Sequence, residues 1–407
     1  MIIQAPFIIT MDPHQRILRD GAVAIRRGCI RDIGAAHQIK ANYPRDKHLH
    51  LKNSVLMPGL VNVHAHLELP PLLDKIRSPN YPMWVLNLLK QKKHLSLDDY
   101  ENAARANVTA LLSTGTTSVG EICTHNISPS VLRHAGIRSI IYHEIISMDP
   151  SARPPRIGKL MHRPSSLITH AVSPHSPYTV AEPVLRMISR SANRRHVPIS
   201  MHVAESKDEI RFLRMKPGGI DRIYAAAGWQ RSWAPVAASP IAYLFSLGVM
   251  NSHFLAVHAV NITDDDIRLL KKSRSSVAHC PRSNALLRVG TMPLKKMLDA
   301  GIPIGLGTDS LASAPSLNLW DEMRYAYRMH RTGRVTSLNI FRMATSGGAK
   351  ALGLNERTGR LVSGLQADII AVPIPHKLSG DLYSDLLRET KKSIMTMVHG
   401  KVLHMQR

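Results

Sequence analysis

The chain has 407 residues, and its 53 lysines and arginines exceed its 29 aspartates and glutamates by 24 charges. Because 44% of the residues are hydrophobic and 20% are charged, the chain can bury a large core, which excludes an intrinsically disordered protein. It has no apolar run of the roughly 20 residues that a membrane span needs, and its N-terminus lacks the basic region of a signal peptide. Three scattered cysteines without a CxxC pair suit a reducing compartment. We therefore expect a globular, cytoplasmic protein with no membrane partner.

The positive charge is also typical of nucleic-acid-binding proteins, but its distribution argues against that function. The basic residues form short, separate groups along the chain, and aromatic residues, which a single-strand platform needs, are only 5%. We expect a solvated basic surface and no nucleic-acid partner. Steering of an anionic substrate and contact with a polyanion remain alternatives.

The two ends of the chain alternate apolar and polar side chains in the manner of β-strands. Residues 1–57 contain IIQAPFIIT and GAVAIRRGCIRDIG, and the pattern returns after residue 356 in GRLVSGLQADIIAV and IMTMVHGKVLH. Two β-rich ends around a different centre predict one small composite β-sandwich, formed by residues 1–57 and 356–407.

Residues 58–355 instead alternate short β-branched runs with amphipathic stretches. Strands are predicted at Leu56–His66, Thr116–Ile122, Arg138–Glu144, Leu167–Ser173, Val197–Val203, Phe254–Val260, Ser276–Cys280 and Ile302–Gly307. Helices are predicted between them, for example over Asp98–Leu112, and over Asp264–Lys272 with Thr263 as its N-cap. Strands that alternate with helices in this way predict a closed parallel (β/α)8 TIM-like barrel of the α/β class. A doubly wound sheet is the alternative, but no GxGxxG follows any strand.

Two histidines lie at the end of the first predicted barrel strand, in PGLVNVHAHLE. His64 and His66 are two residues apart, and because side chains alternate along a strand, both imidazoles face one site. In a barrel, the C-terminal mouth is where such a site works. An HxH pair alone is a weak signal in a chain with 22 histidines.

Other predicted strands bring titratable side chains to the same mouth. These are His202 and Glu205 at and after the fifth strand, His258 at the sixth, His279 at the seventh and Asp309 at the eighth. So many buried polar groups would be costly unless they converge on a ligand. Three imidazoles and a carboxylate, with room for water, are the donor set of a catalytic zinc or iron(II) site.

These motifs give the sequence its likeness to a known family. In chain order they are PGLVNVHAHLE, GTTSVGE, SPHSPYT, HVAES, VHAVNITDDDI, HCPRSNALL, IGLGTDSLASAPSLNLWDEMR and GRLVSGLQADIIAV. Over nearly its whole length the chain resembles the amidohydrolase superfamily, in its deaminase and chlorohydrolase-like branch. The resemblance implies that the metal ligands are His64, His66, His202 and Asp309. It also implies that Glu205 is the proton shuttle and that His258 and Asp309 act on the reacting water.

The number of metal ions follows from the fourth strand. A binuclear member of this superfamily needs a bridging carboxylated lysine, usually from that strand, and LITHAVSPHS contains none. We therefore expect one divalent ion per chain, Zn²⁺ in the first place and Fe²⁺ as the alternative. The zinc site of cytidine deaminases is excluded, because no PCxxC accompanies the HLE of residues 66–68.

Three further residues are assigned by resemblance. His175, in SPHSPYT, would contact the sugar or tail of a nucleoside-like substrate. Trp84, on the long loop after the first strand, would stack on a purine or, alternatively, anchor that loop together with Leu86 and Leu89. His279 is expected behind the metal ligands rather than among them.

The sequence departs from the superfamily between the third and fourth strands. There SMDPSARPPRIGKLMHRPSS is rich in proline and arginine, where relatives usually have a full helix. We expect either a shortened scaffold or a basic loop at the substrate mouth.

Together the motifs predict a metal-dependent aminohydrolase that removes the 6-amino group of an aminopurine nucleoside-like substrate and releases ammonia. The resemblance favours a substrate of the aminodeoxyfutalosine or adenosine-derivative type. Deamination or dechlorination of a triazine or guanine-like ring is the second enzyme hypothesis, and a basic polyanion-binding protein on a hydrolase fold is the non-enzyme hypothesis. Because similar proteins are commonly homodimers, we expect a homodimer.

Overall fold

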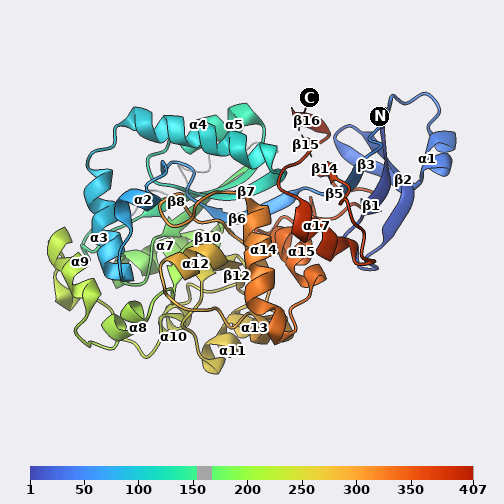
Figure 1. The fold of residues 1–407 in the computed structure, drawn as a ribbon. Coiled ribbons are helices and arrows are strands. Elements are labelled where there is room, and N and C mark those ends of the chain that lie inside the picture. Colours follow the sequence, from blue (N-terminus) through green and yellow to red (C-terminus); the bar gives the residue numbers. More distant parts are fainter. Residues whose placement is uncertain (154–166, 407) are drawn as a thin grey trace.

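The computed structural model describes residues 1–153 and 167–406. They form a barrel of parallel strands surrounded by helices and, beside it, a second sheet that contains both ends of the chain (Figure 1). The predicted α/β fold, a (β/α)8 barrel with an appended β-structure from both termini, is confirmed. The predicted Pro- and Arg-rich segment falls mostly on residues 154–166, outside the described part of the chain.

The barrel sheet has eight parallel strands in the order of the sequence. They are β6 (Leu60–Ala65), β7 (Thr116–Cys123), β8 (Arg138–Ile145), β9 (Ile168–Pro174), β10 (Ile199–Val203), β11 (Phe254–His258), β12 (Ser276–His279) and β13 (Ile304–Leu306). The ring closes just after β13, where the N–H groups of Thr308 and Asp309 donate to the carbonyl oxygen of His64 at 3.0 and 3.1 Å. Closure therefore brings His64 and Asp309 side by side.

Helices surround the barrel, and both helices singled out from the sequence are present. The helices that follow the first barrel strand are α2 (Leu73–Ile76), α3 (Tyr81–Lys92), α4 (Leu97–Ser113), α5 (Ser128–Ala135), α7 (Glu182–Arg194), α8 (Lys207–Leu213), α9 (Gly219–Ala227), α10 (Pro240–Ser246), α11 (Asp264–Ser273), α12 (Pro281–Leu286), α13 (Leu294–Asp299), α14 (Leu319–His330), α15 (Ser337–Ala344) and α16 (Ser346–Ala351). At the start of α11 the hydroxyl of Thr263 accepts a hydrogen bond from the N–H of Asp266, as predicted for its N-cap. No helix within the described residues is long and apolar enough to cross a bilayer.

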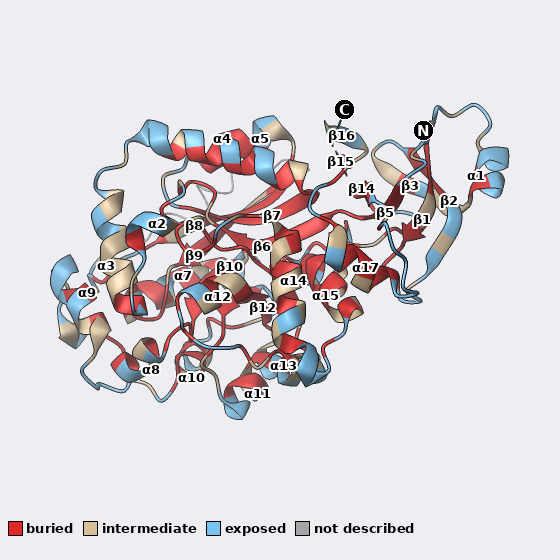
Figure 2. Cartoon of the chain, in the orientation of Figure 1, coloured by how far each residue is buried: buried red, intermediate tan, exposed pale blue. Residues whose placement is uncertain are grey.

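Apolar side chains fill the barrel, and most strand residues are buried (Figure 2). Val61 of β6, Tyr142 of β8 and Leu255 of β11 belong to one hydrophobic cluster with Ala349 of α16 and Leu352, which follows it. Some polar side chains, such as Asn62 of β6 and Ser118 of β7, are buried within the strands as well.

The second sheet combines strands from both termini. Its strands are β1 (Ile2–Ile9), β2 (Ile17–Arg26), β3 (Cys29–Ala35), β4 (His48–His50), β5 (Ser54–Pro58), β14 (Ile369–Pro373), β15 (Met395–Val398) and β16 (Lys401–Met405), with helix α1 (Ala36–Asn42) packed on it. The two ends meet where β5 pairs antiparallel with β14. The domain limits at residues 57 and 356 stay predictions.

The prediction of a single strand over Leu56–His66 is wrong. β5 ends at Pro58 within the terminal sheet, and β6 begins at Leu60 within the barrel. Between them the N–H of Gly59 donates to the carbonyl oxygen of Asp368 at 3.0 Å, and a side chain at Gly59 would collide with Thr117. The hydrophobic run is continuous because both strands are buried, so it does not reveal the change of sheet.

The C-terminal segment is also less purely β than its pattern indicates, because it contains helix α17 (Leu382–Glu389). Leu382, Leu386 and Leu387 are buried, and the helix packs against α14 and α15 of the barrel. These leucines follow helical rather than alternating spacing, which is the signal that identifies the helix.

Candidate active site

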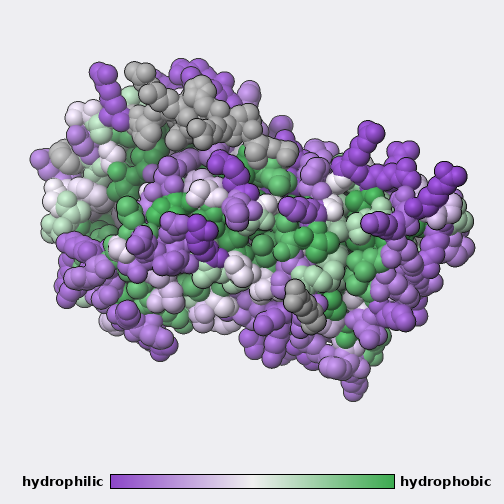
Figure 3. Space-filling model, turned by 90° about the horizontal axis from the view of Figure 1, so that it is seen from above, coloured by the Kyte–Doolittle hydropathy of each residue, from purple (hydrophilic) through white to green (hydrophobic). Residues whose placement is uncertain are grey.

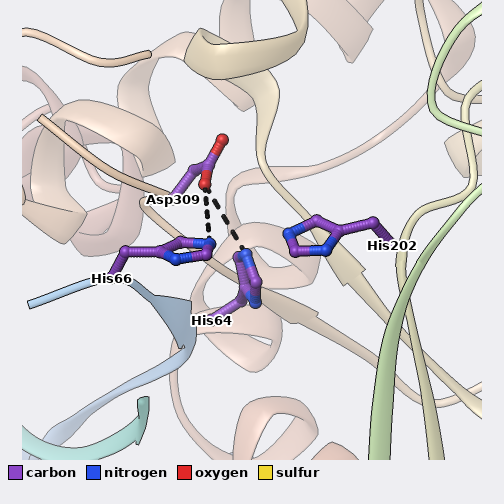
Figure 4. Close-up of side chains that lie close together, drawn as sticks. All are labelled: His64, His66, His202 and Asp309. Carbon is purple, nitrogen blue, oxygen red and sulfur yellow. Dashed lines mark ion pairs between the residues drawn. The ribbon is translucent and has the colours of Figure 1, made fainter. Parts of the chain in front are cut away.

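Four side chains meet at the mouth of the barrel (Figure 4). His64 lies in β6 and His66 just beyond it, His202 lies in β10, and Asp309 follows β13. One ligand atom from each residue lies within 4.8 Å of the others. The structure thus brings together the four residues predicted to bind a metal. No second group of His, Cys, Asp or Glu with this geometry occurs in residues 1–153 or 167–406.

The imidazoles present lone pairs to the centre of this cluster. Nδ1 of His202 lies 3.0 Å from the carbonyl oxygen of His175, so its N–H donates there and Nε2 keeps a free lone pair. His64 is fully buried, yet neither of its ring nitrogens has a hydrogen-bond partner among the described residues. Burial lowers the pKa of His64 to about 4 and that of His66 to about 3. A buried, neutral and unpaired imidazole is costly in itself and fits a metal ligand.

Asp309 completes the cluster with a carboxylate that is held from both sides. Its Oδ1 lies 3.6 Å from Nε2 of His64 and 3.5 Å from Nε2 of His66. Its Oδ2 accepts hydrogen bonds from the hydroxyls of Ser283 (2.6 Å) and Ser313 (2.7 Å). Burial opposes ionisation, but the surrounding imidazoles outweigh it and hold the pKa of Asp309 well below its usual value. Three nitrogens and one oxygen are a donor set that suits a divalent ion such as Zn²⁺ or Fe²⁺.

Glu205 and His258 lie beside the cluster in the wall of a cavity. Oε1 of Glu205 is 3.6 Å from Nε2 of His258. Nδ1 of His258 is 2.9 Å from Oδ1 of Asn284, so the ring donates to that amide and presents Nε2 to Glu205. Burial raises the pKa of Glu205 to about 7. A carboxyl group with this pKa can accept and release a proton near neutrality.

The backbone turns sharply where these side chains leave their strands. Ala204, His258 and Asp309 have left-handed φ angles of 52°, 72° and 58°. Such angles are strained for residues other than glycine and persist where the surrounding structure enforces them. After β10 that support comes from Glu209, whose carboxylate accepts the N–H groups of Ala204 and Glu205 at 3.0 and 2.9 Å.

The cavity beside the cluster is also lined by the two residues predicted to contact the substrate, His175 and Trp84. Nδ1 of His175 lies 3.0 Å from the hydroxyl of Thr179. Trp84 lies in helix α3 rather than in a loop, contrary to the prediction, and its indole N–H donates to the carbonyl oxygen of Ala312 at 3.1 Å. The ring is therefore fixed in the cavity wall, and its contact with a substrate stays a prediction.

His279 lies at the end of β12 and is fully buried. Its Nε2 is 3.2 Å from Nε2 of His330 on α14, and it does not belong to the group of four ligand side chains. This placement agrees with a residue behind the ligands, although its role stays a prediction.

Several residues that shape the site escaped the sequence analysis. Three of them hydrogen-bond to a predicted site residue or to its backbone: Tyr81, Glu209 and Ser313. The fourth, Tyr178, hydrogen-bonds to Tyr81. Ser313 follows the GTDS motif by a few residues and could have been suspected as a partner of Asp309. Tyr178 lies in the SPHSPYT motif, which by itself assigns it no role. Tyr81 carries no local signal, because α3 places it at the site only through the tertiary fold.

The family profile described as "Amidohydrolase family" matches residues 55–403. The chain belongs to the amidohydrolase family. It is 30% identical to a 5-methylthioadenosine/S-adenosylhomocysteine deaminase of Pelotomaculum thermopropionicum, over 99% of this chain and 93% of that protein. It is 28% identical to a 5′-deoxyadenosine deaminase of Methanosarcina barkeri, over 99% of this chain and 92% of that protein.

Solved structures show the same architecture. An adenosine deaminase from Xanthomonas campestris with bound zinc has a TM-score of 0.86 at 25% identity, over 100% of this chain and 93% of that one. Helicobacter pylori aminofutalosine deaminase in complex with methylthio-coformycin has a TM-score of 0.88 at 22% identity, over 98% of this chain and 99% of that one. The chain is thus a hydrolase that acts on C–N bonds, in the deaminase branch that the sequence resembles, with a divalent-metal site.

Proposed function

We propose that the protein hydrolyses the 6-amino group of a 5′-substituted adenosine and releases ammonia, using one zinc ion per chain. The observation that carries this proposal is the position of the Glu205 carboxylate, whose pKa burial raises to about 7, in the cavity that also contains His202 and Asp309. The names of the relatives support the substrate class, since they share an adenosine with an altered 5′ group.

The ion would be held by His64, His66, His202 and Asp309, and when bound it supplies Lewis acidity and makes water a stronger nucleophile at neutral pH. The carboxylate of Glu205 takes a proton from the attacking water and delivers it to the ring nitrogen next to C6. Burial lowers the pKa of His258, so its Nε2 accepts a hydrogen bond from the water and orients it.

The second proton of the water leaves with the amine. As the C6–O bond forms and the C6–N bond breaks, Glu205 protonates the departing nitrogen, so that ammonia and a 6-oxopurine are the products. The two groups that act on the water are held by different partners. Asn284 fixes the ring of His258, and Tyr81 fixes the carboxylate of Glu205.

The cavity beyond the reacting groups is mostly apolar. Trp84, Leu88 and Trp229 offer surface to the purine and the 5′ substituent, and His175 offers an imidazole to the sugar. A neutral, partly apolar nucleoside suits these walls better than a free, fully polar base.

A panel of substrates with ammonia detection tests the proposal. Zinc-loaded protein should deaminate at least one of adenosine, 5′-deoxyadenosine, 5′-methylthioadenosine and S-adenosylhomocysteine with a kcat/KM roughly 10²-fold above that for guanine or a chlorotriazine. Preference for guanine or the triazine would favour the ring-hydrolase hypothesis. No ammonia from any of these adenosines would overturn the proposal.

We further propose that the protein is a homodimer in the cytoplasm, on the strength of its resemblance to related proteins. Light scattering on the purified protein should give twice the chain mass of 45.1 kDa. A mass equal to that of one chain would contradict the dimer.

A further inference from the structure

A tyrosine from the helix that covers the cavity reaches the proposed proton shuttle. Tyr81 is the first residue of α3, and its side chain is buried. Its hydroxyl donates to Oε2 of Glu205 at 2.8 Å. The contact joins two segments that are 124 positions apart in the sequence.

Within residues 1–153 and 167–406, no other side chain hydrogen-bonds the Glu205 carboxylate. The partners of the Glu205 backbone are different: its N–H donates to Glu209 at 2.9 Å, and its carbonyl oxygen accepts from Asn261 at 2.7 Å. The backbone is therefore held independently, and the hydroxyl of Tyr81 fixes the orientation of the carboxylate.

A second tyrosine supports the first. The hydroxyls of Tyr81 and Tyr178 are 3.0 Å apart, and because Tyr81 gives its only proton to Glu205, Tyr178 is the donor of this bond. Tyr178 is itself held, since its carbonyl oxygen accepts the hydroxyl of Tyr224 at 2.7 Å. The bonds from Tyr178 to Tyr81 and from Tyr81 to Glu205 follow one another through the Tyr81 hydroxyl, so they polarise and strengthen one another.

We propose that Tyr81 is the residue that positions Glu205 for proton transfer, an inference that rests on the proposed deaminase function. With Oε2 bound to Tyr81, Oε1 points toward Nε2 of His258, at 3.6 Å, and is the oxygen that exchanges the proton. α3 also contributes Trp84 and Leu88 to the cavity wall. The same helix therefore encloses the substrate and orients the carboxylate.

The test replaces single hydroxyls. Tyr81→Phe keeps the ring and removes the donor, so kcat should fall roughly 10-fold to 100-fold, the loss expected for one hydrogen bond to a charged group, while KM changes less than about threefold. Tyr178→Phe removes only the second donor and should cost less than Tyr81→Phe. Tyr383→Phe is the matched control, because this buried hydroxyl on α17 has no hydrogen-bond partner among the described residues, and its kcat should equal that of the wild type.

A crystal structure of the Tyr81→Phe variant gives a readout that does not depend on turnover. The Glu205 carboxylate should occupy more than one orientation, with the metal content and melting temperature of the wild type. A single, unchanged carboxylate, or a kcat equal to that of the control variant, would overturn the inference. Wild-type protein inactive on every adenosine tested would instead overturn the proposed function, and the crystal structure would still decide the role of Tyr81.

Discussion

Two buried polar clusters of this chain differ in how their charges are paired. At the junction of barrel and terminal sheet, Arg138 binds Asp368 through two hydrogen bonds of 2.7 and 3.0 Å, and Asp368 also accepts the N–H of His399 at 2.8 Å. At the mouth of the barrel, both nitrogens of the buried His64 are without partners among the described residues. In the first cluster a guanidinium binds a carboxylate, whereas in the second three imidazoles surround one carboxylate.

This contrast distinguishes a polar cluster that stabilises the fold from one that serves a function. A buried ion pair joined by two hydrogen bonds stabilises the fold, and removing one partner leaves an uncompensated charge. A cluster of neutral imidazoles around one carboxylate gains little for the fold alone, since both nitrogens of the buried His64 have lost water without gaining a hydrogen-bond partner among the described residues. We therefore expect the two clusters to respond in opposite ways to mutation and to metal.

The largest effect is expected at the junction. Asp368→Ala leaves the Arg138 guanidinium buried and unpaired, and should lower the free energy of unfolding by about 3–5 kcal/mol. Chemical denaturation followed by circular dichroism measures this loss. The double variant Arg138→Met with Asp368→Leu removes both charges and should recover much of the stability. An equal loss in the single and double variants would show that the pair is not coupled.

Glu205→Gln should give the largest loss of activity without a loss of fold. The amide has nearly the shape of the carboxylate but cannot carry the proton, so kcat should fall by roughly 10²-fold or more. Metal content and melting temperature should not change, because Glu205 is not among the four ligands. Turnover near the wild-type rate would assign the proton shuttle to another residue.

A smaller effect, on metal affinity, is expected from the serines that hold the carboxylate of Asp309. Ser313→Ala removes one of the two hydroxyls that hold Oδ2 of Asp309, at 2.7 Å, and leaves the other from Ser283, at 2.6 Å. Loss of a group that orients a metal ligand typically costs roughly 10-fold or more in affinity or activity. Titration with a metal buffer measures the affinity, which should weaken less in Ser313→Ala than in the double variant with Ser283→Ala. Unchanged affinity in the double variant would contradict this role.

The smallest effect is expected from salt. Hydrophilic side chains cover both the barrel and the terminal sheet on the face shown in Figure 3, with hydrophobic ones between them. Exposed charges are screened beyond about 8 Å at physiological ionic strength, so deamination of a neutral nucleoside should barely respond to salt or added DNA. Micromolar DNA binding with a steep salt dependence, by a power of roughly 0.7 to 0.9 per phosphate, would instead support a polyanion partner.

The sequence predicts the parts of this molecule that depend on local pattern and strand order. Because strand ends in a parallel barrel share one mouth, the sequence predicts that its histidines and acids meet there, and the family resemblance selects four of them as metal ligands: His64, His66, His202 and Asp309. The break between two strands at Gly59 is not predictable in this way, since a strand buried in either sheet has the same apolar composition.

Contacts across the fold are the other part that pattern cannot supply. Tyr81 reaches Glu205 because α3 returns over the barrel mouth, and Asp368 reaches Arg138 from 230 positions away. Neither pair has a periodic or spacing signal, so only the tertiary structure identifies them.

Metal content decides whether the three imidazoles and the carboxylate at the barrel mouth form a metal centre. Elemental analysis of purified protein should find close to one zinc or iron ion per chain. His202→Ala should lose the ion together with deaminase activity, while Tyr383→Phe keeps both. Chelated wild-type protein should lose activity and regain it when zinc is added back. Active protein that contains no transition metal, or His202→Ala protein that retains both the ion and activity, would contradict the assignment.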